Sequence, residues 1–277
     1  MELKEILSRH CCKYPNLQIV DIIKLIYQNE FGCGHLLKDE SGSLARLTEE
    51  WESSSSVCKD VYDDIGNGLC RLNLSAAKAG DLSIRTLNRF FVNTAQTHAG
   101  TLSSFETKLS LLSRLCTDKV LPFDSSELEQ ALTLYRENGY PAVSHSNTYR
   151  RCYTPAYRVV QKLYCDFLPL FCKIDLLLQS KPNPVIAIDG NAGAGKSTLA
   201  DLVSKVYDCS IVRMDHFFLP PNKRSINRLC KVGGNVDYER FYNEVIRRIF
   251  HESEFTYRIF DCCKMDFCGS IKINRSE

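Results

Sequence analysis

Eight consecutive residues of this 277-residue chain have the types and spacing best suited to chemistry. They fit the pattern G-x-x-x-x-G-K-[ST], in which glycines let backbone N–H groups surround a phosphate. Lys196 is expected to reach the outer phosphates of a nucleotide, and the Ser197 hydroxyl to take one ligand position on Mg²⁺. The residues expected to contact the nucleotide are Gly190, Asn191, Ala192, Gly193, Ala194, Gly195, Lys196, Ser197 and Thr198.

The residues on either side predict the elements that must position this loop. Residues 185–188 (VIAI) predict a short buried strand, and residues 198–207 predict a helix. Strand, loop and helix in this order place the phosphates at the helix N-terminus, where the helix dipole favours negative charge. A chance glycine turn that opens a helix is the alternative, but both flanks favour a phosphate-binding loop (P-loop) for a nucleoside triphosphate.

A second predicted strand, residues 210–214, ends at Asp215. Because open α/β sheets bind ligands at the carboxyl ends of their strands, we expect Asp215 to face the phosphates. A carboxylate there can ligate Mg²⁺ or accept the proton of the hydroxyl that is phosphorylated. The alternative is an exposed Asp that starts a turn. Asp237 lies close to the N-cap of a helix predicted over about 238–250, so capping explains it as well as substrate binding does.

Three segments together carry a resemblance to a known family. They are residues 185–190 with the loop that follows, residues 213–221 (RMDHFFLPP) and residues 233–241 (GGNVDYERF). In this order and spacing they resemble the bacterial uridine-kinase-like proteins, which belong to the phosphoribulokinase, uridine kinase and pantothenate kinase group of P-loop kinases. The resemblance implies ATP as donor, Mg²⁺ as cofactor and the hydroxyl of a nucleoside-like or related small molecule as acceptor.

The same resemblance assigns roles to individual residues. It implies that Asp215 and Lys196 are catalytic and that Asp237 contacts the hydroxyls of the acceptor. Arg213 and Arg224 are weaker candidates for contacts to phosphate or substrate, and Ser197 and Asp215 are the expected ligands of Mg²⁺.

Two departures from the family pattern modify this expectation. Phe260, the expected contact to the acceptor, stands where uridine kinases have a tyrosine, and Met265 stands where they have a histidine, which argues against uridine itself. The chain also ends at Glu277, before the further core strand and the arginine-bearing lid of the family. We therefore expect a C-terminally truncated kinase domain. The alternative is a nucleotide-binding module without turnover.

The length of the chain predicts two domains. Residues 1–180 predict a mainly helical accessory domain whose role the sequence does not state, and residues 181–184 (KPNP) predict a linker. Residues 185–277 predict the N-terminal part of the kinase domain. The expected fold class is therefore α/β, an incomplete P-loop-type parallel sheet preceded by a mainly α-helical domain.

Helices are predicted at three places in the first 180 residues. They cover residues 17–31, a segment that follows a capping box at Ser126, and residues 156–178, where Pro169 is expected to kink or split the helix.

The composition is that of a soluble globular protein, and we expect a cytoplasmic location. A hydrophobic fraction of 44% is enough for real cores, and a net charge of +2 gives no reason to expect nucleic acid as a partner. The charged N-terminus lacks the apolar core of a signal peptide, and no apolar run approaches the roughly 18 residues of a membrane span. The 14 cysteines are expected to be reduced, and we expect no structural metal, because Cys262, Cys263 and Cys268 lack zinc spacing.

Two N-terminal segments could also do chemistry. Glu30, Cys33 and His35 could form a catalytic or metal-binding group, although a helix end capped by glycines explains them more simply. Residues 145–158 interleave basic and aromatic side chains, which can bind phosphates or stack on the bases of single-stranded nucleic acid. An ordinary solvated helix face is the alternative that we favour.

Overall fold

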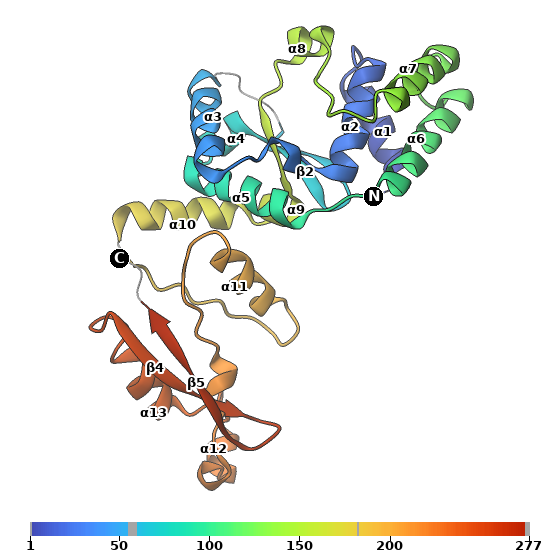
Figure 1. Cartoon of the computed structure of the whole chain (residues 1–277). Coiled ribbons are helices and arrows are strands. Elements are labelled where there is room, and N and C mark those ends of the chain that lie inside the picture. The colour runs from blue at the N-terminus through green and yellow to red at the C-terminus, as the bar shows by residue number, and fades with distance from the viewer. Residues whose placement is uncertain (1, 55–59, 182, 275–277) are drawn as a thin grey trace. The chain divides into compact units, whose positions relative to one another are not determined.

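The computed structural model describes residues 2–54, 60–181 and 183–274. The chain forms two compact units, Met1–Leu177 and Leu178–Glu277 (Figure 1), and each is described by itself. The fold is mixed α/β, with many helices and two small sheets. The predicted linker, residues 181–184, follows the boundary between the units by a few residues.

The first unit combines helices with one three-stranded sheet. Its strands are β1 (Tyr62–Gly66), β2 (Leu69–Asn73) and β3 (Tyr157–Gln161), in the order β1-β2-β3 with antiparallel pairing throughout. Its helices are α1 (Leu3–Lys13), α2 (Ile19–Phe31), η1 (Gly34–Leu36), α3 (Glu40–Ser53), α4 (Leu74–Ala79), α5 (Ile84–Thr97), α6 (Leu102–Thr117), α7 (Ser125–Glu137), α8 (Asn147–Tyr153), α9 (Lys162–Asp166) and most of α10 (Leu168–Ser180).

The predicted helix over residues 17–31 is confirmed as α2, with Ile22 and Ile26 fully buried. The prediction of a helix throughout residues 156–178 is wrong at its start, where β3 pairs with β2. The cause is a long-range contact: β2 lies about 85 residues earlier in the chain, and local periodicity does not reveal such a partner. Pro169 does separate helices, since it lies in the first turn of α10, where its missing N–H removes no helical bond.

The core of the first unit includes an aromatic group beside the sheet. Phe90 of α5 stacks on Tyr164 of α9 with ring centroids 4.3 Å apart, and Phe171 of α10 meets Phe90 edge-on at 4.7 Å. All three rings are almost completely buried. These contacts fix β3 and the helices that follow it against α5.

The capping box predicted at Ser126 is wrong by two residues. The N-cap of α7 is Asp124, whose carboxylate accepts the N–H groups of Ser126 and Glu127 at 2.9 Å. An Asp accepts hydrogen bonds at an N-cap as well as a Ser does, so both positions fit the local pattern. The helix itself ends as expected, with Gly139 in a left-handed conformation.

The second unit has short helices and one antiparallel hairpin. The strands β4 (Glu254–Asp261) and β5 (Asp266–Asn274) pair along their length. The other elements are α11 (Lys196–Ser204), η2 (Met214–Phe217), η3 (Pro221–Lys223), α12 (Ile226–Leu229), α13 (Tyr238–Phe241) and η4 (Tyr242–Ile246), which has π-helical bonding. A buried cluster joins the hairpin to these elements: Phe217, Val245, Phe255, Tyr257 and Ile273.

The parallel sheet predicted for this unit is not shown by the structure. Residues 185–188 and 210–214 are not strands, and the described strands pair only in antiparallel fashion. Val185 and Ile186 are 55% and 41% exposed. A parallel strand is stable when neighbours bond both edges and helices cover both faces, and residues 185–188 lack this burial. The helix predicted over 238–250 begins at Tyr238, but α13 ends at Phe241 and continues as η4.

Candidate functional site

The glycines of the predicted phosphate loop adopt backbone conformations that other residues rarely do. The φ angles of Gly190, Gly193 and Gly195 are 154°, 75° and 82°. A Cβ added at Gly193 or Gly195 would meet no atom within 4 Å, so conformation rather than space requires glycine there. Gly195 is also the N-cap of α11, which begins at Lys196 (Figure 1). The loop therefore ends where a helix presents N–H groups without acceptors inside the helix.

Lys196 folds back over the loop. Its Nζ donates hydrogen bonds to the backbone carbonyls of Gly190 and Asn191, both at 2.7 Å. The loop is also closed by a bond from the Ala194 N–H to the Asn191 carbonyl at 3.2 Å. No carboxylate in the described part of the chain forms an ion pair with this ammonium group. Lys196 is thus a cation held at the loop by neutral acceptors, which phosphate oxygens can replace.

The side chains of Ser197 and Thr198 lie in the first turn of α11 and are exposed. Hydroxyl and carboxylate oxygens suit Mg²⁺, which prefers hard oxygen ligands and retains several waters. Asp215, the second expected ligand, lies in η2 and is exposed as well. Both residues expected to hold Mg²⁺ are therefore accessible oxygen donors, which fits such an ion bound together with a nucleotide.

Arg213 links the segment that carries Asp215 to the helix of the loop. Its Nη2 lies 2.6 Å from Oδ1 of Asp201, which is on α11. This pair ties residues just before η2 to the helix that begins at Lys196. The arginine predicted to contact phosphate or substrate is thus occupied by a positioning contact in this structure, and both partners are partly exposed.

Asp237 is enclosed by contacts within the protein. It is 1% exposed, its carboxylate accepts the Arg240 N–H at 3.2 Å as the N-cap of α13, and Lys223 Nζ lies 2.9 Å away. Burial opposes the charged form, but the bonds from Lys223 and Arg240 outweigh it and lower the pKa of Asp237. Of the two explanations of Asp237 that the sequence left open, the structure shows capping.

Phe260, the other predicted contact to the acceptor, is also interior. It is 2% exposed in β4 and meets Phe267 of β5 edge-on, with ring centroids 5.6 Å apart. Arg224, the further candidate for a phosphate contact, donates its Nε–H to the Leu219 carbonyl at 2.9 Å. The structure thus leaves Lys196, Ser197 and Asp215 accessible, and it uses Asp237 and Phe260 in packing.

Arg240 is a central residue of this unit that the sequence did not single out. It is 6% exposed, donates from Nη1 to the Arg258 carbonyl at 2.7 Å and from Nη2 to the His216 carbonyl, and lies 4.4 Å from the Phe217 ring centroid. It joins the start of α13 to η2 and β4. The sequence feature that could have identified Arg240 is its position in the segment GGNVDYERF, which carries the family resemblance.

The N-terminal group around Glu30 is structural. Its carboxylate accepts the Thr101 N–H at 2.7 Å and the Ser104 hydroxyl at 2.8 Å, and Lys108 Nζ lies 2.6 Å away. These contacts fasten α2 to the start of α6. Burial raises the pKa of Cys33, and the ring of His35 lies edge-on to another aromatic ring, so the three predicted residues do not form one group.

The basic and aromatic residues 145–158 are largely engaged inside the first unit. His145 lies between two partners, with Nδ1 3.0 Å from Asp21 Oδ1 and Nε2 2.6 Å from the Tyr157 hydroxyl. Its ring stacks on Tyr149 at 4.2 Å, and Arg158 pairs with a glutamate on α3. His145, Tyr149, Tyr157 and Arg158 are therefore engaged within the unit, whereas Arg150 and Arg151 of α8 are exposed.

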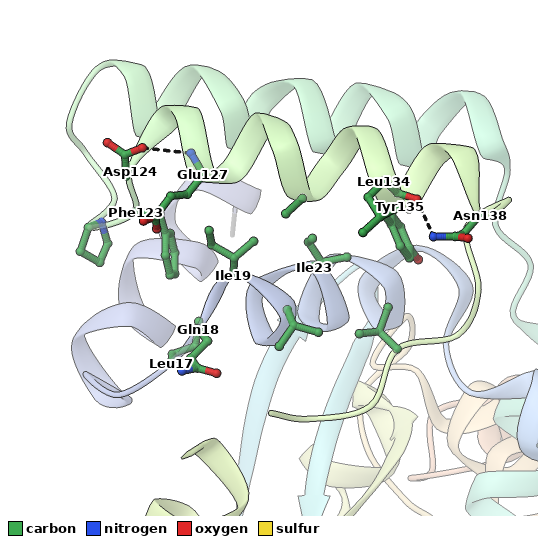
Figure 2. Close-up of a pocket in the computed structure, with 14 residues that line it drawn as sticks. Leu17, Gln18, Ile19, Ile23, Phe123, Asp124, Glu127, Leu134, Tyr135 and Asn138 are labelled. Carbon is green, nitrogen blue, oxygen red and sulfur yellow. Dashed lines mark hydrogen bonds between the residues drawn. The ribbon is translucent and has the colours of Figure 1, made fainter. Parts of the chain in front are cut away.

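Neither of two hollows formed by described residues of the first unit is lined by the predicted nucleotide site. The larger, of about 610 Å³, lies between α2 and α7 and is mainly apolar (Figure 2). The smaller, of about 390 Å³, lies beside β2 and α8. Within residues 2–54, 60–181 and 183–274, no three His, Cys, Asp or Glu side chains gather in a way that could hold a metal ion. No helix in this described part is long and apolar enough to cross a membrane.

Comparison with known proteins found no match. No family model, curated protein or solved structure matched the chain.

Proposed function

We propose that the second unit binds ATP with Mg²⁺ at residues 190–198 and transfers the γ-phosphate to a hydroxyl of a nucleoside-like or related small molecule. The observation that supports this most is the position of Lys196, held across a loop of left-handed glycines at the start of α11. An ammonium group, exposed backbone N–H groups and a helix N-terminus are the features that bind phosphates.

The proposal gives each accessible residue a defined role. Lys196 exchanges its bonds to the loop carbonyls for bonds to the outer phosphates, which are stronger because both partners are charged. Ser197 and Asp215 hold Mg²⁺, whose charge offsets that of the phosphate oxygens. Asp215 also orients the acceptor hydroxyl and accepts its proton. The pair of Arg213 and Asp201 keeps the segment of Asp215 close to α11.

An assay of phosphate transfer tests the catalytic part of this proposal. The full chain is incubated with Mg·ATP labelled in the γ-phosphate and a panel of nucleosides, sugars and pantothenate. We expect the wild type to label at least one acceptor, and Asp215→Asn to reduce that rate about 10²-fold or more, the usual contribution of a general base. Asp266→Asn, which changes an exposed carboxylate at the start of β5, is the matched control and should retain the rate. Full activity of Asp215→Asn would contradict the role of Asp215.

The second candidate function is nucleotide binding without transfer. It is favoured by the burial of Asp237 and Phe260, which leaves the two predicted contacts to the acceptor inside the protein. ATP binding that depends on Lys196, with no label in any acceptor of the panel, would support this function over the kinase.

A further inference from the structure

The first unit buries an arginine that forms no ion pair with any residue that the structure describes. Arg71 of β2 is 4% exposed, and its Nε donates to the Oε1 of Gln28 at 2.8 Å. Its Nη2 is buried and has no hydrogen-bond partner within the described part of the chain. Removing a guanidinium group from water costs free energy, and a buried N–H without an acceptor adds to that cost. Burial acts to lower the pKa of Arg71, but attraction from Tyr157, Tyr149 and Asp63 outweighs it and raises the pKa, so the group stays charged. A buried cation in this state points to a missing partner.

The carboxylate that faces Arg71 across the sheet is hydrogen-bonded by other residues. Asp63 of β1 lies directly opposite Arg71 in the strand register, so the two share one face of the sheet. The carboxylate of Asp63, however, is bonded by Lys13 and by the Tyr14 hydroxyl. Lys13 in turn also pairs with Asp60 at 2.7 Å. Arg71 therefore forms no hydrogen bond with this group in the described part of the chain, although the charge of Asp63 attracts it.

Arg71 lines the pocket of about 390 Å³ beside β2, a volume in the range of small-molecule sites. Its walls come from α1, β1, β2, α8 and the start of β3, and tyrosines contribute much of them. The Tyr153 hydroxyl accepts the N–H of Asn16 at 2.9 Å, so its own O–H remains able to donate. The other lining residues include Tyr14, Tyr62, Tyr149, Tyr157, Asn73 and Thr154. The pocket thus offers a cation, hydroxyl donors and flat apolar surfaces.

We propose that this pocket binds a small organic molecule through an oxyanion group, carboxylate or phosphate, which is held by Arg71. The guanidinium group donates in a planar fork that matches either oxyanion. The tyrosine rings pack against the organic part of the ligand. This site lies wholly within the first unit and is separate from the glycine loop of the second.

The proposal predicts how replacing Arg71 changes the stability of the protein without ligand. If Arg71 is kept for a ligand, replacing it by an apolar side chain of similar length relieves the unpaired charge and does not lower the stability of the free unit. If Arg71 is only structural, the same change removes its bond to Gln28 and its contact with the Tyr157 ring and lowers the stability.

The test uses denaturant unfolding of the full chain, followed by fluorescence. Trp51 is the single tryptophan of the chain and lies in α3, so its emission reports on the first unit. All measurements are made in a Lys196→Ala background, which excludes anion binding at the glycine loop. Arg71→Met is compared with Arg158→Met, which removes a guanidinium group from the adjacent strand that is already paired with Glu50. Acetate and inorganic phosphate are the two probes, added at constant ionic strength.

We expect Arg71→Met to unfold at the same or a higher denaturant concentration than its parent without added anion. We also expect one probe to raise the midpoint of the parent and of Arg158→Met saturably, reaching about a 100-fold change in the folding equilibrium at 100 times its dissociation constant. The midpoint of Arg71→Met should not change with either probe. The probe that raises the midpoint of the parent more shows whether Arg71 binds a carboxylate or a phosphate group. A lower midpoint for Arg71→Met without anion, equal responses of Arg71→Met and its parent, or no saturable response to either probe would overturn the proposal.

Discussion

At the scale of single residues, the two proposed sites each rest on a cation that forms no ion pair with the residues described by the structure. Lys196 is bonded to backbone carbonyls on an accessible loop, whereas Arg71 is buried with an unsatisfied Nη2. The sequence revealed the first because glycines, lysine and serine stand together at fixed spacing. It did not reveal the second, because an arginine in a short strand has no local signature, and its neighbours Tyr14 and Tyr153 come from distant segments.

Buried histidine gives the first unit a pH dependence. Burial lowers the pKa of His145 from 6.5 to about 4, although Asp21 beside it acts in the opposite direction. Between these values the unfolded chain binds a proton that the folded unit does not, so stability falls as the pH drops from about 6.5 to about 4. One pKa unit corresponds to about 1.4 kcal/mol, so the loss from this histidine is about 3 kcal/mol.

This dependence is measured by urea unfolding of the full chain at several pH values, monitored by Trp51 fluorescence. We expect His145→Gln to lose about 3 kcal/mol less than the wild type over this range, whatever its stability at neutral pH. His251→Gln alters an exposed histidine of the second unit and should leave the profile unchanged. Parallel profiles for His145→Gln and the wild type would show that His145 does not titrate in this way.

At the scale of elements, local signals predicted helices better than strands. The helix α2 and the loop before α11 follow from periodicity and glycine spacing within a few residues. The strand β3 was read as helix, since its two valines acquire strand geometry only by pairing with β2. The second unit shows the same limit, because residues 185–188 have a strand-like composition and no strand partner in the structure. Its pairing is instead a hairpin, β4 with β5.

At the start of α7, the N-cap predicted from the local sequence pattern is Ser126, whereas the N-cap in the structure is Asp124. We expect Asp124→Ala to lower the free energy of unfolding of the first unit by about 0.5–2 kcal/mol, because two N–H groups lose their acceptor. Ser126→Ala should change it by no more than about 0.5 kcal/mol, since Asp124 remains in place. Urea unfolding with Trp51 fluorescence compares the two variants. A larger effect of Ser126→Ala than of Asp124→Ala would place the cap where the sequence suggested.

At the scale of the whole molecule, the chain has two compact units with different chemistry. The second carries an accessible glycine loop, for which we propose phosphate binding, and the first carries a pocket with a buried guanidinium group. Length and composition predicted two domains and apolar cores, but they carry no information on the acceptor of a kinase or on the ligand of the first unit. Those specificities depend on side chains that approach only after folding, such as Arg71 and the tyrosines from distant segments that line the same pocket.

The most direct test of the central claim is a calorimetric titration of Mg·ATP into the full chain. We predict saturable binding at one site per chain for the wild type and for Lys231→Ala, which removes an exposed lysine of the same unit. Lys196→Ala should bind at least about 10-fold more weakly, because it loses a charged hydrogen-bond donor to the phosphates. Equal affinity in Lys196→Ala, or no binding to folded wild-type protein, would contradict the assignment of residues 190–198 as a nucleotide site.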